Sequence, residues 1–118
     1  MNLDNRNAIQ ILLVEDHDDS RELLRKVLER WGYSVKAVGS VAHAVAAATQ
    51  NPFGLGIIDL GLPDGDGNEL GRLLIQEKSL PCIALSGTES FEEVGFSARL
   101  TKPVDVQTLF ASLQSLIG

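Results

Sequence analysis

Short apolar runs alternate with longer amphipathic segments along most of the chain. Runs of apolar and β-branched residues that are too short for a buried helix predict strands. These runs occupy residues 9–14, 33–38, 55–59, 82–85 and 99–101. Polar or turn-forming residues follow each run, so every predicted strand ends at a loop.

The segments between these runs carry apolar residues at helical spacing, which predicts amphipathic helices. Gly32 is placed to end the first helix, and Ser40 and Asp105 are placed to cap the second and the last. A short fourth helix is expected over residues 90–96. The side chains expected to face the core are Leu23, Leu24, Val27, Leu28 and Trp31 in the first helix, Val41, Ala44, Val45 and Ala48 in the second, Leu70, Leu73 and Leu74 in the third, and Val106, Leu109, Phe110, Leu113, Leu116 and Ile117 in the last.

The alternation of strands and helices predicts an α/β fold. Parallel strands need long, usually helical connections, and right-handed crossovers place these helices on both faces of the sheet. We therefore expect a doubly wound, five-stranded parallel sheet with helices on both faces, in one domain over residues 9–118. Residues 1–8 are polar and unpatterned, and we interpret them as a disordered lead-in or linker.

Composition and charge exclude several classes of function. A formal charge of -6, without a cluster of Lys and Arg, argues against a nucleic-acid surface. No apolar run approaches the about 20 residues of a membrane span, and the polar start does not resemble a signal peptide. The single cysteine, Cys82, has no intrachain partner and is expected in the core. We therefore expect a cytoplasmic domain without membrane contact.

Polar side chains stand at four of the predicted strand ends. Glu15 and Asp16 follow the first strand, Asp59 ends the third, Ser86 follows the fourth and Lys102 the fifth. The carboxyl ends of parallel strands meet at one edge of a sheet, which is where ligands bind in such folds. Asp59 taken alone could merely cap the next turn, but its neighbours at the other strand ends favour a functional site.

The chemistry of these residue types indicates phosphoryl transfer. Carboxylates brought within about 4 Å of one another would repel by about 4 kcal/mol per pair, and Mg²⁺ is a natural compensating ion. Lys102 can pair with Asp59 or with a phosphoryl oxygen, and the Ser86 hydroxyl can donate to another oxygen. A carboxylate can itself be the covalent acceptor in such a site.

Four motifs in this order resemble the receiver domain of two-component response regulators, which has a flavodoxin-like fold. The motifs are VED at 14–16, IDLGLPDGDG at 58–67, ALSG at 84–87 and LTKP at 100–103. Each motif alone is weak, but all of them fall in order at predicted strand ends. The resemblance covers the chain from about residue 9 to residue 116.

The resemblance implies that Asp59 accepts a phosphoryl group from a phosphohistidine on a histidine kinase or histidine phosphotransfer protein. It also implies Mg²⁺ held by Glu15 or Asp16, by Asp59, and by the backbone carbonyl of Gly61. In such domains the hydroxyl at the position of Ser86 moves toward the phosphoryl group. The lysine at the position of Lys102 pairs with that group, and the peptide bond that follows it is typically cis.

The chain departs from the receiver pattern in two places. Arg99 stands where receivers usually carry an aromatic residue. Burying its charge without a partner would cost on the order of several kcal/mol in desolvation. We expect Arg99 to stay exposed and to contact a partner. Phe91 or Phe96 is expected to fill the cavity that the usual aromatic residue would occupy. The segment between Ser86 and Lys102 is also shorter than in most receivers, so we favour a monomer over dimerisation through that segment.

Several alternatives stay open at this stage. The domain could be a stand-alone regulator or the receiver module of a hybrid histidine kinase. We expect the domain itself to be a self-phosphorylating and self-dephosphorylating signalling domain rather than an enzyme, and the question stays open for a hybrid histidine kinase that contains it. A degenerate receiver would keep the fold as an interaction module without phosphorylation. An aspartyl-phosphate phosphatase of the haloacid dehalogenase type is a poorer fit, because Gly61 stands where those enzymes carry a second acid. His17 is interpreted as a solvated loop residue.

Overall fold

Five parallel strands form the centre of the computed structural model, which describes residues 9–87 and 94–117. The strands are β1 (Gln10–Val14), β2 (Ser34–Val38), β3 (Leu55–Asp59), β4 (Cys82–Ser86) and β5 (Ala98–Thr101). The helices are α2 (Asp18–Arg30), α3 (Val41–Gln50), α4 (Gly67–Lys78) and α5 (Val106–Leu116). The strand order β2-β1-β3-β4-β5, with every neighbouring pair parallel, confirms the expected doubly wound sheet. The short helix expected over residues 90–96 falls mainly on residues 88–93, outside the described ranges.

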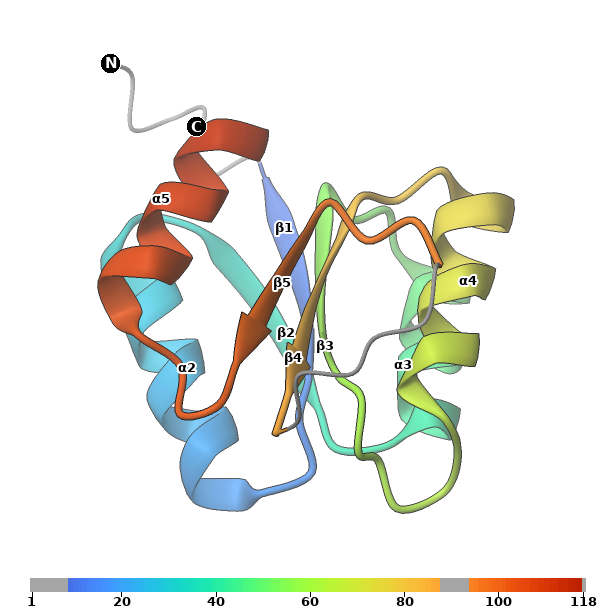
Figure 1. The fold of residues 1–118 in the computed structure, drawn as a ribbon. Coiled ribbons are helices and arrows are strands. Elements are labelled where there is room, and N and C mark those ends of the chain that lie inside the picture. The colour runs from blue at the N-terminus through green and yellow to red at the C-terminus, as the bar shows by residue number, and fades with distance from the viewer. Residues whose placement is uncertain (1–8, 88–93, 118) are drawn as a thin grey trace.

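The helices form two layers, with α2 and α5 on one face of the sheet and α3 and α4 on the other (Figure 1). Successive strand residues point to opposite faces, so each strand supplies both layers of the core. In β1, Ile11 and Leu13 pack toward α2 and α5, whereas Leu12 and Val14 pack toward α3 and α4. Burial on both faces explains why these strands are continuous apolar runs.

Three side chains predicted to face the core are instead exposed. Leu23, Val45 and Val106 have exposed fractions of 61%, 38% and 41%. Each helix packs on the sheet through a narrow stripe, which in α2 is formed by Leu24 and Leu28. Neighbouring helix residues are rotated by about 100° from each other, so Leu23 points away although Leu24 is buried. The prediction for these three residues was wrong.

The predicted helix ends are confirmed. Gly32, the residue after the C-cap Trp31 of α2, adopts a φ of 101°, in the left-handed region expected there. The Ser40 hydroxyl accepts a hydrogen bond from the His43 N–H, and the Asp105 carboxylate accepts one from the Gln107 N–H. These caps begin α3 and α5 at the residues that the sequence indicates.

Arg99 is exposed, as expected from its charge. Phe96 is buried in the core on the α3–α4 side, with its ring against Gly71 of α4. Phe91 lies outside the described residues. No helix in the two described stretches has the length and apolar character that crossing a membrane requires.

Cys82 is expected to react with thiol reagents only when the protein unfolds. The side chain is fully buried in β4, and burial raises the pKa of its thiol to about 12. The thiolate is the reactive form, so native protein should be labelled far more slowly than protein in urea. An Ellman's reagent assay with and without urea measures this difference. Prompt labelling of folded protein would contradict the described packing of β4.

A carboxylate from a distant loop caps α3. Asp64 accepts hydrogen bonds from the Val41 N–H at 2.8 Å and the Ala42 N–H at 3.1 Å. These bonds lower the pKa of Asp64. An anion at a helix N-terminus is favourable because it meets unpaired N–H groups and the positive end of the helix dipole.

We expect Asp64→Asn to destabilise the protein most near neutral pH. The folded-state pKa of Asp64 is lowered, so its stabilising effect is complete above the pKa of the unfolded chain. The effect is lost as the pH falls through the lower folded-state value, and the difference from wild type should shrink below about pH 4. Urea titrations at several pH values measure this, with Asp19→Asn on the exposed start of α2 as the control. A difference that does not depend on pH would refute the role of the charge.

Candidate functional site

The carboxyl ends of four strands meet at one edge of the sheet. The register aligns Val14 with Ile58, Asp59 with Leu85, and Ser86 with Thr101. The loops continue this alignment, because the Lys102 N–H donates to the Ser86 carbonyl at 2.7 Å. The structure therefore brings together the strand-end residues predicted from the sequence: Glu15, Asp16, Asp59, Ser86 and Lys102.

Lys102 bridges two buried carboxylates at this edge. Its ammonium group lies 2.9 Å from Asp59 Oδ2 and 3.0 Å from Glu15 Oε1. Glu15 and Asp59 are 1% and 4% exposed, whereas the Lys102 side chain is 31% exposed. The other oxygen of Asp59 accepts a hydrogen bond from the Gly61 N–H at 3.1 Å. The peptide bond between Lys102 and Pro103 is cis, as the resemblance implied.

The three charges shift one another's pKa values. Burial and the contact with Asp59 raise the pKa of Glu15, although Lys102 opposes this. Burial also acts to raise the pKa of Asp59, but the contacts with Glu15, Lys102 and the Gly61 N–H outweigh it and lower that pKa. Burial disfavours the ammonium form of Lys102, yet its two carboxylate partners raise its pKa overall. Asp59 is therefore anionic at neutral pH, which is the form that can act as a nucleophile.

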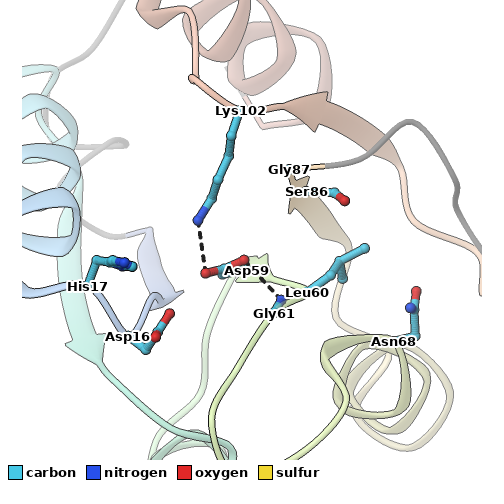
Figure 2. Close-up of a pocket in the computed structure, with 9 residues that line it drawn as sticks. All are labelled: Asp16, His17, Asp59, Leu60, Gly61, Asn68, Ser86, Gly87 and Lys102. Atoms are coloured by element: carbon cyan, nitrogen blue, oxygen red, sulfur yellow. Dashed lines mark hydrogen bonds and ion pairs between the residues drawn. The ribbon is translucent and has the colours of Figure 1, made fainter.

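A cavity of about 420 Å³ opens beside Asp59 (Figure 2). Asp59 reaches it from the end of β3 and Lys102 from the loop after β5, with Asp16 on one side and Ser86 on the other. Ser86 is buried except where it meets the cavity, and the backbone of Gly61 forms part of the wall. The full set of lining residues is Asp16, His17, Asp59, Leu60, Gly61, Asn68, Ser86, Gly87 and Lys102.

The two adjacent acids after β1 have different surroundings. Both Glu15 oxygens are engaged within the protein, one by Lys102 and the other by the His17 N–H at 3.3 Å. Asp16 is half-buried and lines the cavity, and its carboxylate makes no hydrogen bond to another residue in the described ranges. The cavity therefore presents Asp16 together with Asp59.

The donors around this cavity fit Mg²⁺. Mg²⁺ prefers oxygen ligands and usually takes only one or two carboxylates, keeping waters and phosphate oxygens as its other ligands. Asp16 and Asp59 supply two carboxylates on the cavity wall, and Gly61 supplies a backbone carbonyl nearby. Glu15, Asp16 and His17 also place one possible ligand atom each within 4.8 Å of one another.

Sequence reasoning missed two polar residues at this site. Asn68, at the start of α4, lines the cavity, and its Oδ1 is buried with no hydrogen-bond partner among the described residues. Arg21 of α2 donates to the backbone carbonyls of Glu15 and Asp16 at 3.0 and 3.4 Å. Neither stands at a strand end, which was the signal used. His17 is exposed, as expected for a loop histidine, but it also borders the cavity.

Comparisons with known proteins agree with this architecture. The family model of the response regulator receiver domain matches residues 11–114 of this chain. The transcriptional regulatory protein GltR of Pseudomonas aeruginosa is 32% identical over 120 residues, covering 94% of this chain and 50% of that protein. The KDP operon transcriptional regulatory protein KdpE of Escherichia coli is 38% identical over 110 residues, covering 88% and 49%. The chain spans about half the length of these curated relatives.

Solved structures resemble the fold over nearly the whole chain. A CheY-like response regulator receiver domain from Methylobacillus flagellatus has a TM-score of 0.83 and 32% identity, covering 92% of this chain and 98% of that one. A sensor protein from Polaromonas sp. has a TM-score of 0.83 and 32% identity, with coverages of 93% and 96%.

Proposed function

Because the chain belongs to the response regulator receiver domain family of two-component signalling, we propose that Asp59 is its phosphoacceptor. The observation that carries this proposal is the contact between Asp59 and Lys102 at 2.9 Å, on the wall of the cavity. It provides a carboxylate held in its anionic form, with a positive charge beside the position that an incoming phosphoryl group would take. A receiver is a signalling module rather than a conventional enzyme.

The proposed step transfers a phosphoryl group from a histidine nitrogen to Asp59. A carboxylate oxygen attacks phosphorus, the P–N bond breaks, and its electron pair stays on the leaving imidazole. Lys102 then pairs with a phosphoryl oxygen in place of the carboxylate, and the Ser86 hydroxyl donates to another. Transfer of this kind depends mainly on positioning and on charge neutralisation.

We propose that Asp16, Asp59 and the Gly61 carbonyl hold Mg²⁺ at this site. The ion, when bound, supplies positive charge that neutralises the oxygens of the transferring group. Glu15 contributes by fixing the Lys102 ammonium at 3.0 Å, while Asp16 faces the cavity. This division follows from the different surroundings of the two acids.

The proposed partner is a histidine kinase or a histidine phosphotransfer protein, and we take residues 9–118 as the receiver domain. The protein that contains this domain is either a stand-alone regulator or a hybrid histidine kinase, and both stay as hypotheses. Relatives of about twice the length are named as transcriptional regulators, and one similar structure is named as a sensor protein. These names describe those proteins.

Phosphorylation by a small donor tests the proposal. The protein is incubated with phosphoramidate and Mg²⁺, and its intact mass is recorded beside Asp59→Asn and the exposed control Asp19→Asn. We expect one added phosphoryl group in wild type and in Asp19→Asn, and none in Asp59→Asn or with EDTA. No adduct in wild type, together with no binding of beryllofluoride, would leave the degenerate interaction module as the better explanation.

A further inference from the structure

We propose that Arg21 is a positioning residue for the metal site, because its guanidinium group fixes the backbone that carries both acids after β1. This inference rests on the proposed function, since it concerns the same Mg²⁺ site. Arg21 lies in the first turns of α2, and its Nη1 donates to the carbonyl of Glu15 at 3.0 Å and to that of Asp16 at 3.4 Å. One side chain therefore holds two consecutive peptide groups.

The guanidinium group is itself held in place. Its Nη2 pairs with Asp18 Oδ1 at 2.5 Å, and only 26% of the Arg21 side chain is exposed. A planar guanidinium can donate in several fixed directions at once, which a lysine ammonium on its flexible chain does less well. Arg21 therefore joins α2 to the turn that follows β1, with little freedom for either to move.

The turn is fixed from its other side by the end of β2. The Glu15 N–H donates to the Val38 carbonyl at 3.0 Å. Next to Val38, Gly39 leaves room for Arg21, because a Cβ on Gly39 would lie 3.0 Å from Arg21 Nη1. The backbone of the two acids thus sits between Arg21 and the β2–α3 connection.

Fixing this backbone decides where the two carboxylates point. Glu15 turns inward to Lys102, and Asp16 turns into the cavity beside Asp59. Because the two residues are adjacent, a rotation of the peptide between them would redirect both side chains together. Partners that orient a metal ligand commonly change metal affinity by about 10–100-fold when they are removed. We infer the same kind of role for Arg21, acting through backbone carbonyls.

A positioning role and a purely electrostatic role predict opposite effects of Arg21→Ala on Mg²⁺ affinity, so the variant distinguishes them. If Arg21 acted only as a nearby positive charge, its removal would strengthen the binding of a cation. If it positions the acids, its removal should weaken Mg²⁺ binding by about tenfold. Gly39→Ala should weaken binding in the same direction, but less than Arg21→Ala and without any change of charge, because the added Cβ would push the guanidinium slightly away from the two carbonyls. Arg21→Lys should fall between wild type and Arg21→Ala.

The dissociation constant is measured with Mg²⁺ alone, by following backbone amide resonances in an NMR titration. Arg25→Ala is the matched control, because Arg25 is on the same helix and, within the described part of the chain, forms its ion pairs at the surface with Glu22 and Glu29. Urea titrations in EDTA confirm that each variant is folded. Unchanged or tighter Mg²⁺ binding by Arg21→Ala, with wild-type binding intact, would overturn this inference alone. Absence of Mg²⁺ binding by wild type would overturn the proposed metal site and this inference with it.

Discussion

Replacing Lys102 with methionine is expected to lower the free energy of unfolding by about 2–3 kcal/mol in Mg²⁺-free buffer. The substitution keeps most of the apolar stem but leaves Glu15 and Asp59 buried without their shared cation. Removing one partner of a buried ion pair is costly because the remaining charge is neither hydrated nor compensated. The loss of stability should be smaller than for a fully buried ion pair, because 31% of the Lys102 side chain is exposed.

Urea unfolding followed by the fluorescence of Trp31 measures this loss. Trp31 is the single tryptophan and packs edge-on against Phe110, with the ring centroids 4.9 Å apart, so unfolding separates the two rings. Lys26→Met, on the exposed side of α2, is the control and should change stability little. An ion that binds only the folded state stabilises it. Added Mg²⁺ should therefore restore more stability to Lys102→Met than to wild type, because in the variant the ion compensates carboxylates that Lys102 already compensates in wild type. Equal losses in the two lysine variants would show that Lys102 does not compensate the buried carboxylates.

Gly67→Ala is expected to destabilise the fold by about 3 kcal/mol, although alanine is a better helix former than glycine. A Cβ on Gly67 would lie 2.5 Å from the Leu60 Cα and 2.6 Å from the Asp59 carbonyl oxygen. Both are backbone atoms, so no side-chain rotation can relieve the contact. Either α4 must move away from the sheet or the loop after Asp59 must shift.

The same substitution should slow phosphorylation by small donors, because that loop carries Gly61 and directly follows Asp59, the proposed acceptor. Gly87→Ala is the matched control for stability, since a Cβ there meets no atom of the described residues within 4 Å. Urea unfolding is measured for both variants. Because Gly87 lines the cavity, the rate of adduct formation of Gly67→Ala is compared with that of wild type. A Gly67→Ala protein as stable as Gly87→Ala would mean that α4 does not approach Leu60 as closely as described.

The sheet and the chemical content of the site could be predicted from the sequence because both depend on local patterns. The short runs that end at loops located all five strands, and the parallel order then required Asp59, Ser86 and Lys102 to meet at one edge. The strand ends needed no knowledge of tertiary contacts. The caps at Ser40 and Asp105 were predictable for the same reason, since each bonds within its own helix turn.

The parts that failed or were missed depend on tertiary geometry. Leu23 and the buried Leu24 differ only in their rotation about the helix axis. Which of them contacts the sheet depends on how the helix packs against it. Asp64 caps a helix 23 residues away, so no local pattern indicates the bond. Arg21 acts on backbone carbonyls, which carry no signal in the sequence. For the same reason the different surroundings of Glu15 and Asp16 emerged only from the structure.

Locating the phosphoryl group in the chain is the most direct test of Asp59 as the phosphoacceptor. Protein treated with phosphoramidate and Mg²⁺ is reduced with borohydride, which converts an aspartyl phosphate to homoserine, and its peptides are sequenced by mass spectrometry. We expect homoserine at position 59, only in samples that received both the donor and Mg²⁺. Homoserine at Asp16 or another carboxylate instead, or a phosphoryl group that resists reduction, would contradict the assignment of Asp59 as the acceptor.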